Sequence, residues 1–155
     1  MSREEDPRAI ARAIIGSGLY MVLGTADEAG NPWTSPVYYA HEGVARFLWV
    51  SSPERRHSRN IAVRPQVSLV IFSSGTPIST GQAVYAAAEA NQATEPERQA
   101  GIELFSRRTL VHGGRAFAVA DVTESAHLRL YVATVSEMWI LEPGTDNRIP
   151  VMPQP

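Results

Sequence analysis

The chain has 155 residues, of which 14 are basic and 16 acidic, so its formal net charge at pH 7 is −2. This length is typical of one domain with one hydrophobic core, and we expect residues 1–155 to form a single domain. Every basic residue is Arg, and the sequence contains neither Lys nor Cys. Their absence excludes disulfides, cysteine-bound metals, thiol nucleophiles and a lysine Schiff base.

Charge and hydropathy also limit the partners. The slightly negative net charge disfavours nucleic acid, because nucleic-acid binders usually carry a basic face. The first residues are charged rather than apolar, and no apolar run approaches the roughly 20 residues that cross a bilayer. The four His residues show no metal-ligand spacing. These observations predict a cytoplasmic protein with no membrane contact and no metal site.

The first half of the chain is predicted to contain two helices and three strands. Apolar residues recur at helical spacing in the first segment, which has Pro7 in its first turn. Strand-forming residues follow, separated by turn residues. Ser52 as N-cap and Pro53 in the first turn predict the second helix. In order, these elements are a helix at 6–16, strands at 19–25, 33–40 and 44–50, and a helix at 54–63.

The second half is predicted to contain four strands and one long helix. The helix begins near Pro96 and ends before Gly113 and Gly114. The tail from Pro143 is rich in proline and is expected to be irregular. In order, these elements are strands at 67–72 and 80–90, a helix at 95–110, and strands at 115–122 and 128–141. Consecutive antiparallel strands with a few peripheral helices predict an α+β barrel or sandwich.

One segment has the composition of an anion site. At residues 49–60 a strand leads into a helix through two serines, and arginines follow at once. Free amides at a helix start attract phosphate, serine hydroxyls donate hydrogen bonds, and Arg binds two oxygens together. The alternative interpretation is a capped surface helix with a solvated arginine face.

The order of several short runs resembles the pyridoxamine 5'-phosphate oxidase-like FMN-binding split-barrel family. The runs that carry the resemblance are Gly24-Thr25 and residues 30–37, 49–52, 56–61 and 64–69. The resemblance implies a mostly antiparallel split β-barrel of six to seven strands with peripheral helices. It also implies a homodimer that binds FMN in two symmetric clefts at the subunit interface.

The resemblance further implies roles for individual residues. The backbone of Ser35 and Val37 would bond the flavin ring, and Gln82 would lie beside the ribityl chain or the ring edge. Trp139 would reach the flavin across the dimer, with Arg148 following at the family's spacing. The alternatives are a solvent-facing amide for Gln82 and a core or interface aromatic for Trp139. The residues implied at the strand end and the phosphate are Trp49, Ser51, Ser52, Arg56 and His57.

The function implied is an FMN-dependent oxidoreductase that transfers hydride or electrons to or from a small molecule. Pyridoxamine phosphate oxidases proper carry Arg, Tyr and Ser substrate-phosphate residues near the penultimate helix, and a C-terminal Arg-x-His element. This sequence departs from both, so oxidation of vitamin B6 is not expected. The alternatives are a deazaflavin-dependent reductase of the same fold and a non-enzymatic flavin- or haem-binding protein.

Overall fold

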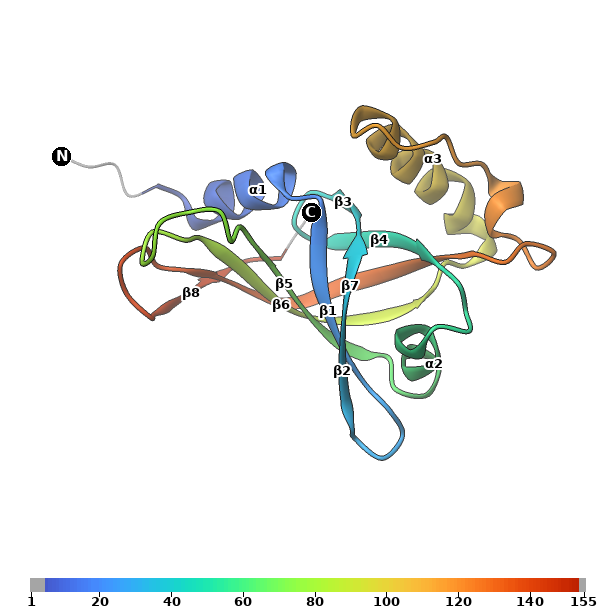
Figure 1. Cartoon of the computed structure of the whole chain (residues 1–155), viewed down its shortest axis with the longest axis horizontal. Helices are drawn as coiled ribbons and strands as arrows, with labels where there is room; N and C mark the ends of the chain where they lie inside the picture. The colour runs from blue at the N-terminus through green and yellow to red at the C-terminus, as the bar shows by residue number, and fades with distance from the viewer. Residues whose placement is uncertain (1–4, 154–155) are drawn as a thin grey trace.

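The computed structural model describes residues 5–153 and has one curled antiparallel sheet with helices around it (Figure 1). The helices are α1 (Pro7–Ser17), α2 (Arg56–Val63) and α3 (Glu95–Val111), with a 3-10 turn η1 (Val119–Val122). The strands are β1 (Tyr20–Ala26), β2 (Pro32–Tyr38), β3 (Ala40–Glu42), β4 (Arg46–Ser51), β5 (Gln66–Phe72), β6 (Ala83–Gln92), β7 (Arg129–Leu141) and β8 (Arg148–Val151). The strand order is β2-β1-β5-β6-β7-β4-β3, and β8 pairs with β7. The α+β split-barrel prediction is confirmed.

The two faces of the sheet are covered differently. Alternate residues of β1, such as Met21 and Leu23, point into the main core, which α1 and α2 also enter. A second cluster joins α3, through Ile102 and Phe105, to the opposite face of β4 and β7. No helix in the described part of the chain is long and apolar enough to cross a membrane.

Strand β2 lies at one end of the sheet order, so one of its edges has no neighbouring strand among residues 5–153. Two backbone hydrogen bonds, one at each end of the β1–β2 pair, show which residues of β2 turn their backbone toward β1. Asp27 N donates to Asn31 O at 3.0 Å, and Tyr39 N donates to Leu19 O at 3.3 Å. Odd-numbered residues of β2 therefore pair their backbone with β1, and even-numbered residues face the open edge. Pro36 fits this alternation, because the amide hydrogen that it lacks would point away from β1.

A chain of buried hydrogen bonds holds α2 against the β1–β2 hairpin. Asn60 Nδ2 donates to Thr25 Oγ1 at 3.0 Å, and Thr25 Oγ1 donates to Trp33 O at 3.3 Å. Arg64 reaches the hairpin tip, where it donates to the carbonyls of Asp27 and Glu28. These contacts fix the position of α2 beside β2.

The predicted strand at 115–122 is wrong, because side chains of α3 bind its backbone before a strand neighbour can. Ser106 Oγ accepts a hydrogen bond from Phe117 N, and Thr109 Oγ1 donates to Arg115 O, both at 2.8 Å. Asp121 accepts from Ala118 N and so begins the 3-10 turn η1. The segment is therefore irregular up to the turn.

The tail and several element ends also differ from prediction. The tail contains β8, whose Pro150 is tolerated because β8 pairs with β7 alone among the strands of the described residues. Helix α2 begins at Arg56, and Ser52 accepts from Glu54 N in the preceding turn instead of capping the helix. The predicted strand at 33–40 divides between Tyr38 and Ala40, and the strand predicted from residue 80 begins at Ala83.

We predict that Asn60→Ala lowers the free energy of unfolding by about 1–3 kcal/mol, because it removes the buried amide that joins α2 to Thr25. Urea unfolding measures this change. Arg59→Ala, at an exposed position of the same helix, is the control and should stay within about 0.5 kcal/mol of wild type. Equal stability of the two variants would show that the amide chain does not hold α2.

Candidate functional site

Two connected hollows form one groove on the outer face of the sheet, the face turned away from the main core. They have volumes of 420 and 350 Å³ and share Gly24, Thr34 and Ser68. The floor is made of small residues, and a Cβ on Gly24 would lie 2.5 Å from Ser68 Oγ. Outside the shared residues, the groove is lined by Val22, Thr25, Ala26, Pro32, Trp33, Gln66, Val67, Leu69, Val70, Tyr85, Ala86, Ala87 and Trp139.

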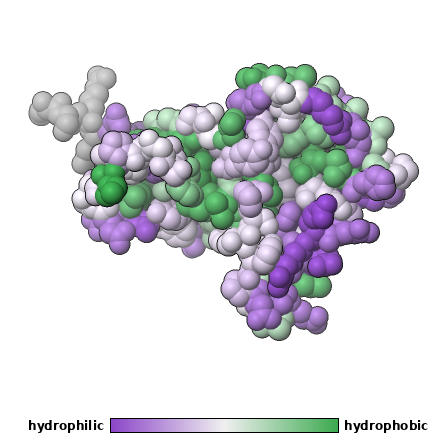
Figure 2. All heavy atoms as spheres, viewed as in Figure 1, coloured by the Kyte–Doolittle hydropathy of each residue, from purple (hydrophilic) through white to green (hydrophobic). Residues whose placement is uncertain are grey.

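A fixed positive charge lies beside one end of the groove. The Arg56 guanidinium lies over the Trp33 ring, 4.4 Å from its centroid, and Trp33 lines the groove. Figure 2 shows strongly hydrophilic residues gathered over α2, where Arg55 and Arg59 are also exposed. This end of the groove can hold an anion through Arg56.

The predicted phosphate residues Ser51, Ser52 and His57 lie on the short path from β4 into α2. Ser51 Oγ and His57 Nε2 are hydrogen-bonded at 3.0 Å. Burial lowers the pKa of His57 below its ordinary value of 6.5, and the nearby charge of Arg55 lowers it further. His57 is therefore neutral at pH 7, and it contributes hydrogen bonding but no charge.

The other side of the groove is aromatic. Trp139 is half-buried and lines the groove together with Tyr85, which lies opposite it on β6. The Arg148 guanidinium lies 4.5 Å from the centre of the Tyr85 ring and pairs with Asp146 at 3.0 Å. Trp139 thus lines one end of the groove, and Arg56 lies beside the other end, over the ring of Trp33.

Three other predicted residues have no side chain in the groove. The side chains of Ser35 and Val37 lie on the opposite face of β2 from Thr34, and their backbone belongs to the register with β1. Trp49 is fully buried and stacks on Tyr131 with ring centroids 5.8 Å apart. Trp49 therefore has no exposed side-chain surface to offer a cofactor.

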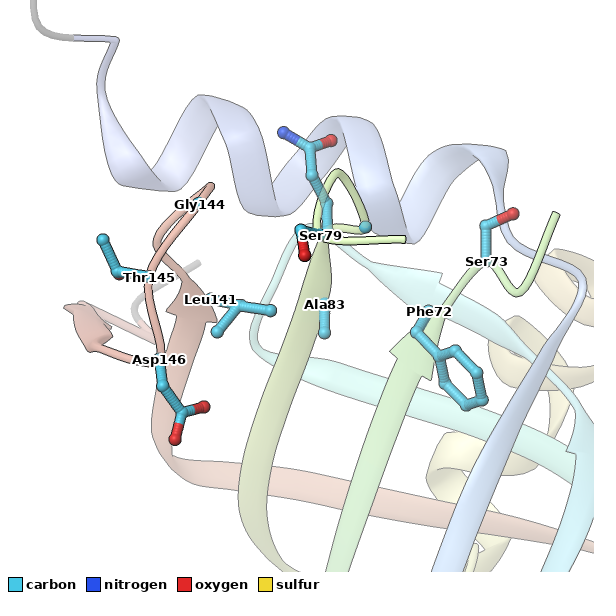
Figure 3. Close-up of a pocket in the computed structure, with 10 residues that line it drawn as sticks. Phe72, Ser73, Ser79, Ala83, Leu141, Gly144, Thr145 and Asp146 are labelled. Atoms are coloured by element: carbon cyan, nitrogen blue, oxygen red, sulfur yellow. The ribbon is translucent and has the colours of Figure 1, made fainter. Parts of the chain in front are cut away.

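Gln82 lies away from α2. Strand β5 leaves α2 at Gln66 and ends at Phe72, which pairs with Ala83, so Gln82 is beyond the far end of β5. There it is exposed and borders a separate hollow with Phe72, Leu141 and Asp146 (Figure 3). Within one chain, Gln82 and the Arg56 end of the groove are at opposite ends of the sheet.

Comparison with known families decides the family of the chain. The family model for pyridoxamine 5'-phosphate oxidase matches residues 9–141. The chain belongs to the pyridoxamine 5'-phosphate oxidase family. The family resemblance carried by the short sequence runs is confirmed.

Solved structures with the split-barrel fold of this family are similar over most of the chain. A heme-binding protein from Mycobacterium smegmatis has a TM-score of 0.77 and 22% identity, over 98% of this chain and 60% of that chain. The heme storage protein HutZ from Vibrio cholerae has a TM-score of 0.69 and 16% identity, over 92% of this chain and 99% of that one. An F420 reductase has a TM-score of 0.61 and 16% identity, over 88% and 98%. No curated protein matches the chain.

Sequence reasoning missed the residues that form the groove floor of this family member. Gly24 in a strand is a signal of close approach by another group, and alternation along β1 places it on the face opposite Leu23. Thr34 and Ser68 join the floor because both pair with Gly24 across the sheet. The sequence alone does not determine this strand register. The described residues contain no group of three His, Cys, Asp or Glu side chains that could hold a metal ion.

We predict that His57→Gln reduces the loss of thermal stability at acid pH. In the unfolded chain the imidazole regains its ordinary pKa, so the unfolded state binds more protons as pH falls below 6.5. Folding stability that depends on neutral His57 is present above that pH and is lost as pH falls. Melting temperatures at about pH 7.5 and about pH 5 measure the loss.

Burial also lowers the pKa of His41, so wild type and His57→Gln should both lose some stability in acid. The difference between the two losses isolates His57. If both proteins lose the same number of degrees, buried neutral His57 does not contribute to acid sensitivity.

Proposed function

We propose that the chain is an FMN-dependent oxidoreductase that transfers hydride or electrons to or from a small molecule. The observation that supports this most strongly is the groove, which is lined by Tyr85 and Trp139 at one end and has the Arg56 guanidinium beside the other. A flavin mononucleotide needs an anion site for its phosphate and a flat, mostly apolar surface for its ring. When bound, FMN supplies the electron transfer, and the protein supplies position and electrostatics.

The residues at the Arg56 end fit a phosphate group. Arg56 presents two parallel N–H donors for its oxygens, and the stacking on Trp33 limits the freedom of the guanidinium. Ser51 ends β4 and Ser52 follows it on the path to α2, so their hydroxyls can supply further donors. Arginine keeps its charge across the neutral range, so the anion site does not depend on the protonation of His57.

The open edge of β2 fits the polar edge of a flavin ring. Thr34 presents an amide and a carbonyl to this edge, and Pro36 presents a carbonyl, because the odd-numbered residues are turned to β1. We therefore assign to Thr34 and Pro36 the ring contacts that the family resemblance gave to Ser35 and Val37. The small floor at Gly24 and Ser68 leaves space for the ring above it.

We further propose a homodimer with a cofactor site at each end of the subunit interface. Gln82 lies too far along β5 and β6 to join Arg56 within one chain. A second copy packed on the outer face would bring its own Gln82 to the site. The exposed and half-exposed side chains available for this contact are Tyr20, Val22, Val70, Phe72, Tyr85 and Trp139.

Haem and deazaflavin are the alternatives, because two of the similar structures are named as heme proteins and one as an F420 reductase. Among the described residues, no His lines the groove, and His is the usual axial ligand of haem. This favours a flavin over haem. A deazaflavin would use the same ring surface and the same anion site.

The absorbance spectrum of freshly purified protein tests the proposal. Bound FMN gives the visible bands of a flavin, haem gives a Soret band, and a deazaflavin gives neither of these spectra. Bleaching of the flavin bands by NADH or NADPH without air, and their return with an acceptor, would support an oxidoreductase. A bound flavin that dithionite bleaches but NADH and NADPH do not, and that an acceptor reoxidises no faster than free reduced FMN, would identify a passive binder.

We predict that Arg56→Ala weakens FMN binding by about 1.5–3 kcal/mol, the size of a hydrogen bond to a charged group. Fluorescence quenching of added FMN measures the affinity. Riboflavin, which lacks the phosphate, should bind wild type and variant almost equally. Arg12→Ala, at an exposed position of α1, is the control and should leave both affinities unchanged. Equal FMN affinity in wild type and Arg56→Ala would contradict a phosphate site at this end of the groove.

We predict that Trp139→Ala weakens the dimer and the cofactor site together, because Trp139 is a wall of the groove that the second copy would cover. Sedimentation over a range of protein concentrations measures the dimer, and FMN titration of the same samples measures the site. A monomeric protein that still binds FMN as tightly as wild type would contradict a site at the subunit interface.

A further inference from the structure

A tyrosine and a histidine 74 residues apart are hydrogen-bonded at the end of β2. Tyr38 Oη and His112 Nδ1 are separated by 2.7 Å. Tyr38 is the last residue of β2, and His112 is the C-cap of α3. The contact therefore joins the end of β2, the strand with the open edge, to the C-terminus of α3.

The surroundings of Tyr38 hold its ring in place. The rings of Tyr20 and Phe105 approach the Tyr38 ring edge to face, with centroids 5.9 and 5.7 Å away. The charged and titratable groups that face Tyr38 are Tyr20 from β1 and Arg108 and His112 from α3. Burial raises the pKa of Tyr38, while the charge of Arg108 opposes this. The hydroxyl therefore keeps its proton at neutral pH and can donate it.

The position of Tyr38 along β2 relates it to the groove. Its side chain is on the same face of the strand as Thr34 and Pro36, and Thr34 lines the groove. Arg56, on Trp33, marks the anion end of β2, and Tyr38 lies five residues further on, about 17 Å along an extended strand. Trp33 and Tyr38 lie on opposite faces of β2, so a cofactor anchored at Arg56 that crosses the open edge to the face of Thr34 would have its ring directed toward Tyr38.

We propose that Tyr38, supported by His112, is the proton donor to a small substrate with a polarised double bond, such as a quinone, carbonyl or nitro group. This inference rests on the proposed oxidoreductase function. The substrate accepts a hydride from the reduced flavin at one atom of the double bond, and the electron pair of that bond moves to the oxygen. The Tyr38 O–H bond breaks as its proton passes to this oxygen.

His112 restores the proton to Tyr38. Protonated His112 donates from Nδ1 to the tyrosine oxygen, and the imidazole then takes a proton from water. His112 is exposed at the C-terminus of α3, so water reaches its imidazole. Two electrons and one hydrogen therefore come from the flavin, and one proton comes from solvent through the pair.

Two acceptors with different proton requirements test the proposal. FMN-loaded protein is reduced without air and mixed rapidly either with a benzoquinone, which takes up hydride and proton, or with ferricyanide, which takes up electrons alone. We expect Tyr38→Phe to slow oxidation by the quinone on the order of 100-fold and to leave oxidation by ferricyanide unchanged. His112→Asn should also slow the quinone reaction alone. Arg12→Ala, at an exposed position of α1, is the control and should change neither rate.

A measurement on the cofactor-free protein tests the pair itself. The NMR titration of the His112 imidazole should shift in Tyr38→Phe and stay unchanged in Tyr20→Phe, because only Tyr38 contacts Nδ1. An unchanged titration in Tyr38→Phe, or equal quinone rates in wild type and Tyr38→Phe with full flavin, would overturn the proposal. If wild type binds no flavin, or if its reduced flavin reacts with neither acceptor, the proposed function itself fails.

Discussion

The open edge of β2 is the constraint on which the proposed chemistry depends. Within residues 5–153, β2 has a neighbour on one side alone, so its other edge presents unpaired amides and carbonyls. Such an edge attracts other chains unless something covers or blunts it. Pro32 and Pro36 blunt this edge, because each removes an amide that would have pointed outward. Thr34 and Tyr38 keep their outward amides. The polar edge of a flavin would satisfy the groups that the sheet leaves unpaired, and the edge would then be a binding surface.

The electrostatics of the α2 end follow from the way in which this helix is packed. The hydrogen bonds from Asn60 to Thr25 and from Thr25 to Trp33 hold α2 against the hairpin, and this packing buries His57 as well. Burial keeps His57 neutral, whereas Arg56 stays at the surface and keeps its charge. The same packing therefore makes His57 a neutral hydrogen-bonding group while Arg56, the residue next to it, remains a permanent cation. An anion held there would meet a site whose charge is constant across the neutral range.

The elements that the sequence predicted well are those whose own periodicity determines them. Strand β1 and helix α1 are recognisable from local patterns, and both lie within about two residues of their predicted ends. The strand predicted at 115–122 was wrong because the side chains of Ser106 and Thr109, on α3, bind the backbone of this segment. The prediction of an irregular tail was wrong because β8 pairs with β7 in spite of the proline-rich composition. Contacts between distant segments are not visible in local composition.

The candidate site was predictable in part for the same reason. Arg56 and the serines before it form one short run, so their grouping is visible in the sequence. The ring contacts expected at Ser35 and Val37 stay a prediction, but the register pairs the backbone of both residues with β1 and leaves that of Pro36 at the open edge. Pro36 gives a usable signal of this, since a proline cannot donate to a paired neighbour. The meeting of Tyr38 with His112 has no such signal, because it depends on where the C-terminus of α3 lies.

The polar side chains of α3 argue for a substrate without a phosphate group. In pyridoxamine phosphate oxidases proper, as the resemblance implies, residues near this helix hold the substrate phosphate. Here Ser106 and Thr109 are buried and bind the backbone at 115–117, and Arg108 donates to the carbonyls of Ile15 and Gly18. Side chains that already hold the fold together cannot also bind a phosphate without leaving buried polar groups unpaired. What this end of the helix offers instead is the His112 imidazole hydrogen-bonded to the Tyr38 hydroxyl, a pair suited to protonating a small acceptor rather than binding a phosphate.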